Sequence, residues 1–79
     1  LQYLNLCENQ LESLPSGLSV LTKLKALDLA RNVIKSLPDI FSQLTNLEML
    51  YLSRNHLSSL PSSISCLKKL SHFLMDNNR

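Results

Sequence analysis

The sequence predicts an α/β fold in which one coil repeats along an axis, with a parallel β-sheet on one side and short helical segments on the other. Three observations carry this prediction. Apolar residues occupy positions 1, 4, 6, 11, 14, 18 and 21 of every repeat that contains them. Each repeat is too thin to bury these residues alone, so neighbouring repeats must stack. A Leu-Pro pair recurs every 23 residues, and so does an asparagine, at Asn9, Asn32, Asn55 and Asn78.

The opening segment of each repeat predicts a strand. Its pattern, "LxxLxL", alternates with a period of two, which is typical of a short strand with one buried face. Residues 1–79 form one array, with full repeats at 1–23, 24–46 and 47–69 and a partial repeat at 70–79. We therefore expect four parallel strands near residues 3–7, 26–30, 49–53 and 72–76, within a residue or two.

The second half of each repeat predicts a short helical return. Its apolar residues lie three or four apart in "LxxLPxxLxxL", which indicates an extended turn followed by a helical or 3₁₀ segment. Pro15, Pro38 and Pro61 fit near the first turn of such a segment, where a missing N–H costs nothing. Between the two halves, the asparagine amide is expected to pair with backbone groups left open by the turn, which makes its role structural.

The repeated segments carry a resemblance to a known family. They are "LQYLNLCENQL", "LKALDLARNVI", "LEMLYLSRNHL" and "LSHFLMDNN", and they resemble the leucine-rich repeat motif L-x-x-L-x-L-x-x-N-x-L over essentially the whole chain. The resemblance implies a right-handed solenoid with a curved parallel β-sheet on its concave side and short 3₁₀ or helical segments on its convex side. The 23-residue "LPxxL" form is similar to intracellular repeats of Ras-pathway scaffolds and LAP-type polarity proteins.

A candidate binding site follows from the side chains at positions 3, 5 and 7, which point onto the concave face. Leu74 is the leucine that departs from the core positions, and Tyr51, Met49 and His72 stand beside it, with Arg54 at the edge. Aromatic, Met and Arg side chains around an exposed Leu are typical of a protein-binding hot spot. These five residues are the predicted partner-binding site. The alternative is that they are ordinary scattered apolar surface.

The other half of that face is predicted to be smaller and more polar, with Asn5, Ala26, Asp28 and Ala30. The net charge of +2 comes from interspersed charges of both signs, which gives no reason to expect nucleic acid as a partner. No apolar run approaches the ~18 residues that a membrane span needs. We expect neither membrane insertion nor nucleic-acid binding.

Catalytic and metal sites are not expected. His72 and Asp76 lie four residues apart on a predicted strand, roughly 13 Å, which is beyond hydrogen-bond reach. Cys7 and Cys66 do not combine with the histidines in a metal-ligand spacing, and they lie too far apart along the stack for a disulfide. Two unpaired thiols favour a reducing compartment. We therefore expect no cofactor, no metal and no enzymatic activity, and a cytoplasmic location.

The leading functional hypothesis is a non-catalytic scaffold for signal transduction, which binds a protein on its concave face. The family resemblance leaves two alternatives: a regulatory or targeting segment of a larger signalling enzyme, and an extracellular recognition domain. In each case the apolar ends of the array are expected to be covered by flanking repeats of the same chain.

Overall fold

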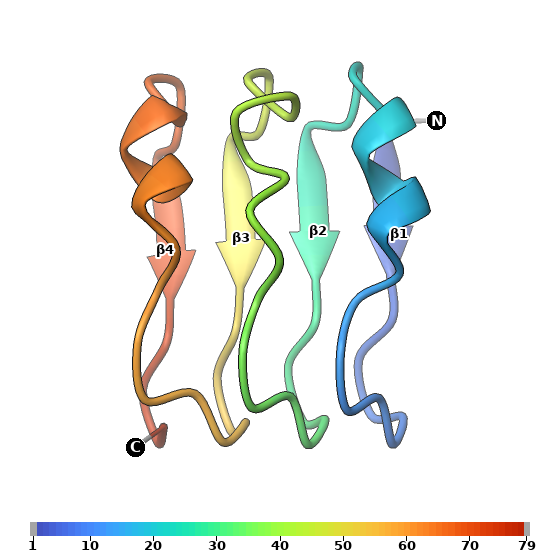
Figure 1. Ribbon diagram of the computed structural model, residues 1–79, viewed down its shortest axis with the longest axis vertical. Helices are drawn as coiled ribbons and strands as arrows, with labels where there is room; N and C mark the ends of the chain where they lie inside the picture. The colour runs from blue at the N-terminus through green and yellow to red at the C-terminus, as the bar shows by residue number, and fades with distance from the viewer. Residues whose placement is uncertain (1, 79) are drawn as a thin grey trace.

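The strands of the molecule pair side by side in one parallel sheet (Figure 1). The computed structural model describes residues 2–78. Consecutive strands are neighbours in the sheet, and each residue pairs with the residue 23 positions further on, as Leu4 does with Leu27 and Leu27 with Leu50. The chain winds as a right-handed coil, down each strand and back in front of it. The strands are β1 (Tyr3–Asn5), β2 (Ala26–Asp28), β3 (Met49–Tyr51) and β4 (His72–Leu74).

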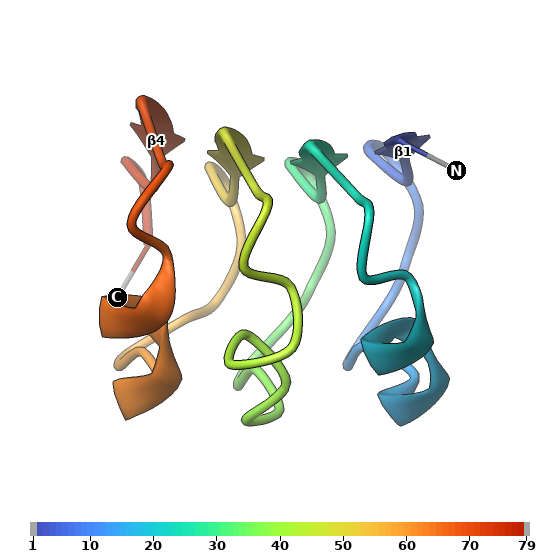
Figure 2. The same ribbon diagram turned by 90° about the horizontal axis from the view of Figure 1, so that it is seen from above.

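The predicted helical segments form on the side opposite the sheet (Figure 2). They are the 3₁₀ helices η1 (Ser16–Val20) and η2 (Ser62–Cys66), and each begins directly after a proline, Pro15 or Pro61. The prediction is wrong for the second coil, in which the return is a series of turns. That coil buries the bulky Ile40 where the helical coils carry Gly17 or Ser63. The coil with the irregular return is thus the one that carries the largest side chain at this position.

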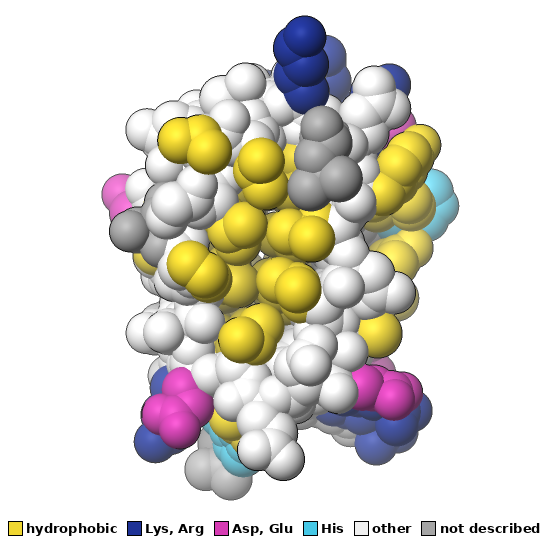
Figure 3. All heavy atoms as spheres, turned by 90° about the vertical axis from the view of Figure 1, so that its right-hand side faces the viewer, with side chains coloured by type: hydrophobic (Ala, Val, Ile, Leu, Met, Phe, Trp, Pro, Cys, Tyr) yellow, Lys and Arg dark blue, Asp and Glu magenta, His cyan; other side chains and the backbone are white. Residues whose placement is uncertain are grey.

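The core confirms the predicted apolar positions in the middle of the stack and corrects them at its ends. Leu27, Leu50 and Leu52 are at most 1% exposed, whereas Phe73 is 36% exposed although it occupies a core position. No strand in the described part of the chain lies beyond β4 to cover it. Apolar side chains are also visible across the N-terminal end of the stack (Figure 3). Leu1 lies outside the described residues. Within residues 2–78, no helix has the length and apolar character of a membrane span.

The repeated asparagines pair with the backbone, as predicted. The Nδ2 group of Asn32 donates to the carbonyl of Leu29 in its own coil at 3.0 Å and to that of Leu6 in the preceding coil at 2.9 Å. Its Oδ1 accepts from the N–H of Leu11 at 3.1 Å. Asn55 and Asn78 repeat this pattern. These three asparagines therefore tie neighbouring coils together through backbone groups that the turn leaves unpaired.

A residue with left-handed backbone directly precedes each of the four repeated asparagines. Glu8, Arg31, Arg54 and Asn77 have φ between 58° and 61°. The strands begin where predicted and end two residues earlier, whereas backbone hydrogen bonds between coils continue to the left-handed residue, as from the Glu8 N–H to the Ala30 carbonyl at 2.9 Å. Left-handed backbone is unfavourable for side chains other than Gly, Asn and Asp. Of the four, only Asn77 belongs to the residue types that tolerate it.

Replacing Arg31 with asparagine should therefore stabilise the array by about 0.5–1 kcal/mol, since asparagine relieves part of the left-handed backbone cost. Lys35→Asn is the matched control, because it removes the same charge at an exposed residue of the return. Urea unfolding of the two variants checks the prediction. Equal changes in unfolding free energy at both sites would contradict it.

Candidate functional site

The sheet presents its outward side chains in two columns, which form the surface that we call the sheet face. One column contains Tyr3, Ala26, Met49 and His72, and the other contains Asn5, Asp28, Tyr51 and Leu74. Members of a column are direct neighbours across adjacent strands, so their backbones lie roughly 4.8 Å apart. Side chains from distant parts of the sequence therefore form one continuous surface on this rigid face.

The structure brings four of the five predicted site residues together. Met49 pairs with His72 and Tyr51 with Leu74 in the register of β3 and β4. The Tyr51 hydroxyl lies 3.5 Å from the Met49 Sδ, so the ring leans across from its own column to the next. Leu74 is 52% exposed. Arg54 follows β3, and its charge acts on Asp76 at the edge of this group. The five predicted residues form what we call the C-terminal patch.

The edge of the C-terminal patch contains a carboxylate that is already hydrogen-bonded. The Ser53 hydroxyl donates to Asp76 Oδ1 at 2.6 Å, and the Asn77 amide donates to Asp76 Oδ2 at 3.0 Å. The bond from Ser53 is the largest cause that lowers the pKa of the Asp76 carboxyl below its ordinary value. A backbone hydrogen bond and the charge of Arg54 lower that pKa further. Asp76 is thus held as an anion by groups of this chain.

A hollow lies in the other half of the sheet face, where the sequence suggested only a small and polar surface. Its volume is about 160 Å³, and it is lined by Tyr3, Leu4, Asn5, Ala26, Leu27, Asp28 and Tyr51. The small Ala26 leaves space between the larger side chains of β1 and β3. Sequence reasoning missed Tyr3, Ala26 and Asp28 as site residues. The signal was present in the columns, since Tyr3, Ala26 and Met49 follow one another there.

The polar residues considered for catalysis are engaged in other contacts. The Nδ1 atom of His72 lies 3.0 Å from the hydroxyl of its neighbour Ser71. Ser53 and Asp76 do meet, but as the hydrogen-bonded pair described above. Among residues 2–78, no group of three or more His, Cys, Asp or Glu side chains is placed to hold a metal ion.

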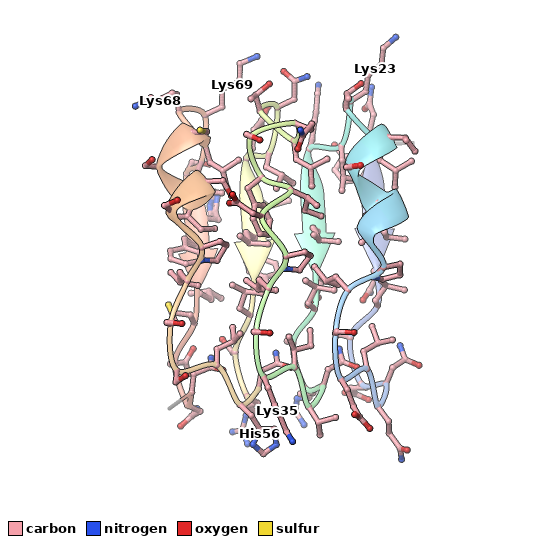
Figure 4. The ribbon with its side chains drawn as sticks, viewed as in Figure 1. Lys23, Lys35, His56, Lys68 and Lys69 are labelled. Atoms are coloured by element: carbon pink, nitrogen blue, oxygen red, sulfur yellow. The ribbon has the colours of Figure 1, made fainter. Side chains whose placement is uncertain are left out.

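Several basic side chains lie at the two edges of the coil instead of on the sheet face. Lys23, Lys68 and Lys69 project from the edge where the return segments lead into the strands, and Lys35 and His56 lie at the opposite edge (Figure 4). Lys69 donates to the Asn46 side chain of the neighbouring coil at 2.9 Å. None of these basic side chains lines the hollow.

The chain is similar to known repeat proteins along its whole length. The family model described as "Leucine rich repeat" matches residues 1–57 and 38–79. A leucine-rich repeat protein of Leptospira interrogans has a solved structure that superposes with a TM-score of 0.95 at 44% identity. The match covers 99% of this chain and 20% of that protein, so the chain spans about a fifth of its length. No curated protein sequence matches the chain.

Fold, core and asparagine pattern agree with these matches. Domains of this family generally mediate protein–protein interaction. The parallel sheet, the stacked coils and the matched family model lead to one assignment: the chain belongs to the leucine-rich repeat family.

Proposed function

We propose that the chain is a non-catalytic scaffolding module that binds a protein partner on its sheet face. The C-terminal patch is the main contact. An exposed leucine, an aromatic ring and a methionine lie side by side there, with a guanidinium at the edge. Such groups dominate the centres of protein interfaces, because they bury much apolar area on a rigid support.

The observation that carries this proposal is that β3 and β4 lack a side-chain cap that β1 and β2 have. In the first two coils, Asn5 accepts from the Cys7 N–H at 3.0 Å and Asp28 accepts from the Ala30 N–H at 3.1 Å. The same position holds Tyr51 and Leu74 in β3 and β4, and neither side chain has a carbonyl or carboxylate oxygen for this bond. Two large side chains, the partly buried Tyr51 and the exposed Leu74, thus stand where the first two coils have a capping side chain. Departures from local folding rules concentrate at functional sites.

The proposal extends to the ends of the array and to its compartment. The apolar N-terminal end and the 36% exposed Phe73 at the other end are surfaces that additional repeats of the same chain would cover. The 23-residue repeats support kinship with intracellular scaffolds of signal transduction. Cys7 and Cys66 are free thiols, which supports a reducing, cytoplasmic location.

The proposed contact is tested by Tyr51→Ala and Leu74→Ser. Each change should weaken partner binding by about 1–3 kcal/mol, as expected for hot-spot residues. Each should change the free energy of unfolding by no more than about 0.5 kcal/mol, as surface substitutions usually do. The measurement is recovery of bound proteins from cell extract by the full chain, with circular dichroism to verify folding.

Gln43→Ala is the control for this experiment, because Gln43 is exposed on the side opposite the sheet. It should leave recovery unchanged. Equal recovery of every partner by wild type and by the Tyr51→Ala/Leu74→Ser double variant would place the contact elsewhere on the solenoid.

A further inference from the structure

We propose that the hollow on the sheet face binds a basic side chain, arginine or lysine, of the partner protein. This inference rests on the proposed function and names the chemistry of the contact. Its site lies next to the C-terminal patch and shares Tyr51 with it. The argument depends on the shape of the hollow and on the charge within it.

Two aromatic side chains line the hollow, together with a small residue on the strand between them. Tyr3 of β1 and Tyr51 of β3 both line it, and Ala26 of the intervening β2 lies between them. Two strand spacings separate β1 from β3, roughly 9.5 Å. Tyr3 and Tyr51 also stand in different columns, so their backbones lie further apart than this spacing. The volume of about 160 Å³ admits a planar guanidinium or an alkyl-ammonium chain, and aromatic rings attract such cations.

The hollow contains one carboxylate, that of Asp28. The side chains that adjoin Asp28 on the sheet face are uncharged: Asn5 and Tyr51 across the strands, and Ala26 and Ala30 along the chain. Asp28 Oδ1 accepts from the Ala30 N–H at 3.1 Å, and within residues 2–78 no hydrogen bond reaches Oδ2. The Oδ2 atom of Asp28 is thus available to a donor from the partner. In Asp76, by contrast, both carboxylate oxygens already accept a hydrogen bond.

A cation matches these features better than the alternatives. An anion would be repelled by Asp28. An apolar side chain would desolvate the carboxylate without offering it a hydrogen bond, which is costly. An arginine or lysine side chain lays its methylenes between the rings and brings N–H donors to Oδ2, as a charge-assisted hydrogen bond requires.

The test uses two peptides and no natural partner. Acetyl-Gly-Arg-Gly-amide carries the cation, and acetyl-Gly-citrulline-Gly-amide replaces it with a neutral group of similar shape. Each peptide is titrated into the isotope-labelled full chain by NMR. The arginine peptide should shift the signals of Tyr3, Ala26 and Tyr51, with a dissociation constant about tenfold lower than that of the citrulline peptide.

The matched variant is Asp28→Asn, which removes the charge and retains the local fold. Asparagine already makes the equivalent cap in the first coil, where Asn5 accepts from the Cys7 N–H. This variant should bind both peptides alike. Asp76→Asn, which removes a carboxylate outside the hollow, should leave the arginine preference unchanged.

Two results would overturn the inference. One is equal binding, or no binding, of the two peptides by the wild-type chain. The hollow would then show no preference for a cation, or would bind neither group. The other is an arginine preference that survives in Asp28→Asn. Because the titration needs no partner, it is independent of the Tyr51→Ala/Leu74→Ser recovery experiment. Failure of this inference is therefore distinguishable from failure of the proposed function.

Discussion

Truncation of Leu52 to alanine is expected to lower the free energy of unfolding by about 2–5 kcal/mol, the range for a buried leucine in a packed core. Leu52 is 0% exposed and lies in the third coil, with β2 on one side and β4 on the other. Backbone hydrogen bonds hold both neighbouring coils in place, since the Leu52 N–H donates to the Leu74 carbonyl at 2.7 Å and the Leu29 N–H donates to the Tyr51 carbonyl at 2.8 Å. The cavity left by the substitution therefore cannot collapse fully.

Leu6→Ala is the matched control for this prediction. Leu6 has the same position in the first coil but is only partly buried. Its truncation should cost clearly less in urea unfolding, because less apolar surface returns to water. A negligible loss at Leu52 would mean that the repeat frame is wrong.

Asn55→Ala should cost about 2–4 kcal/mol, because each buried polar group left without a partner costs roughly 1–3 kcal/mol. Asn55 is 6% exposed. Its Nδ2 donates to the carbonyls of Leu29 and Leu52 at 2.9 and 3.0 Å, and its Oδ1 accepts from the Ile34 N–H at 3.1 Å. The substitution removes donors and acceptor together, and with them the side-chain hydrogen bonds that link the third coil to the second.

Asn9→Ala tests whether the coil-to-coil bonds cause this loss. Asn9 is exposed, and its Nδ2 donates to the carbonyls of Leu6 and Cys7 in its own coil. Its truncation should cost less than ~1 kcal/mol, the usual net value of an exposed hydrogen bond. Similar unfolding midpoints for the Asn9 and Asn55 variants would exclude the asparagine hydrogen bonds between coils as the source of this stability.

The fold was predictable because the same physical requirement recurs in every repeat. A residue such as Leu50 must be buried in each coil, and Asn55 must satisfy the same turn, so the sequence repeats these letters at a fixed spacing. The partial exposure of Phe73 was not predictable in this way. It depends on whether another coil covers the residue, and the spacing of letters within a repeat does not contain that information.

The candidate site was predictable only in part. The columns correctly placed Tyr51 beside Leu74, since strand geometry fixes which residues are neighbours. The hollow was missed because it depends on an absent side chain, the one that Ala26 lacks, and on the lean of the Tyr51 ring toward Met49. Side-chain rotamers of this kind are decided by packing across three strands, which a repeat pattern does not specify.

The claim that the sheet face is the binding surface is tested most directly by site-specific photo-crosslinking. A photoreactive benzoyl-phenylalanine is placed at Tyr51 in one sample and at Gln43, on the opposite side, in another. Both samples are irradiated in cell extract under identical conditions. Our account predicts a covalent partner adduct from position 51 and none from position 43. An adduct from position 43 alone would contradict it.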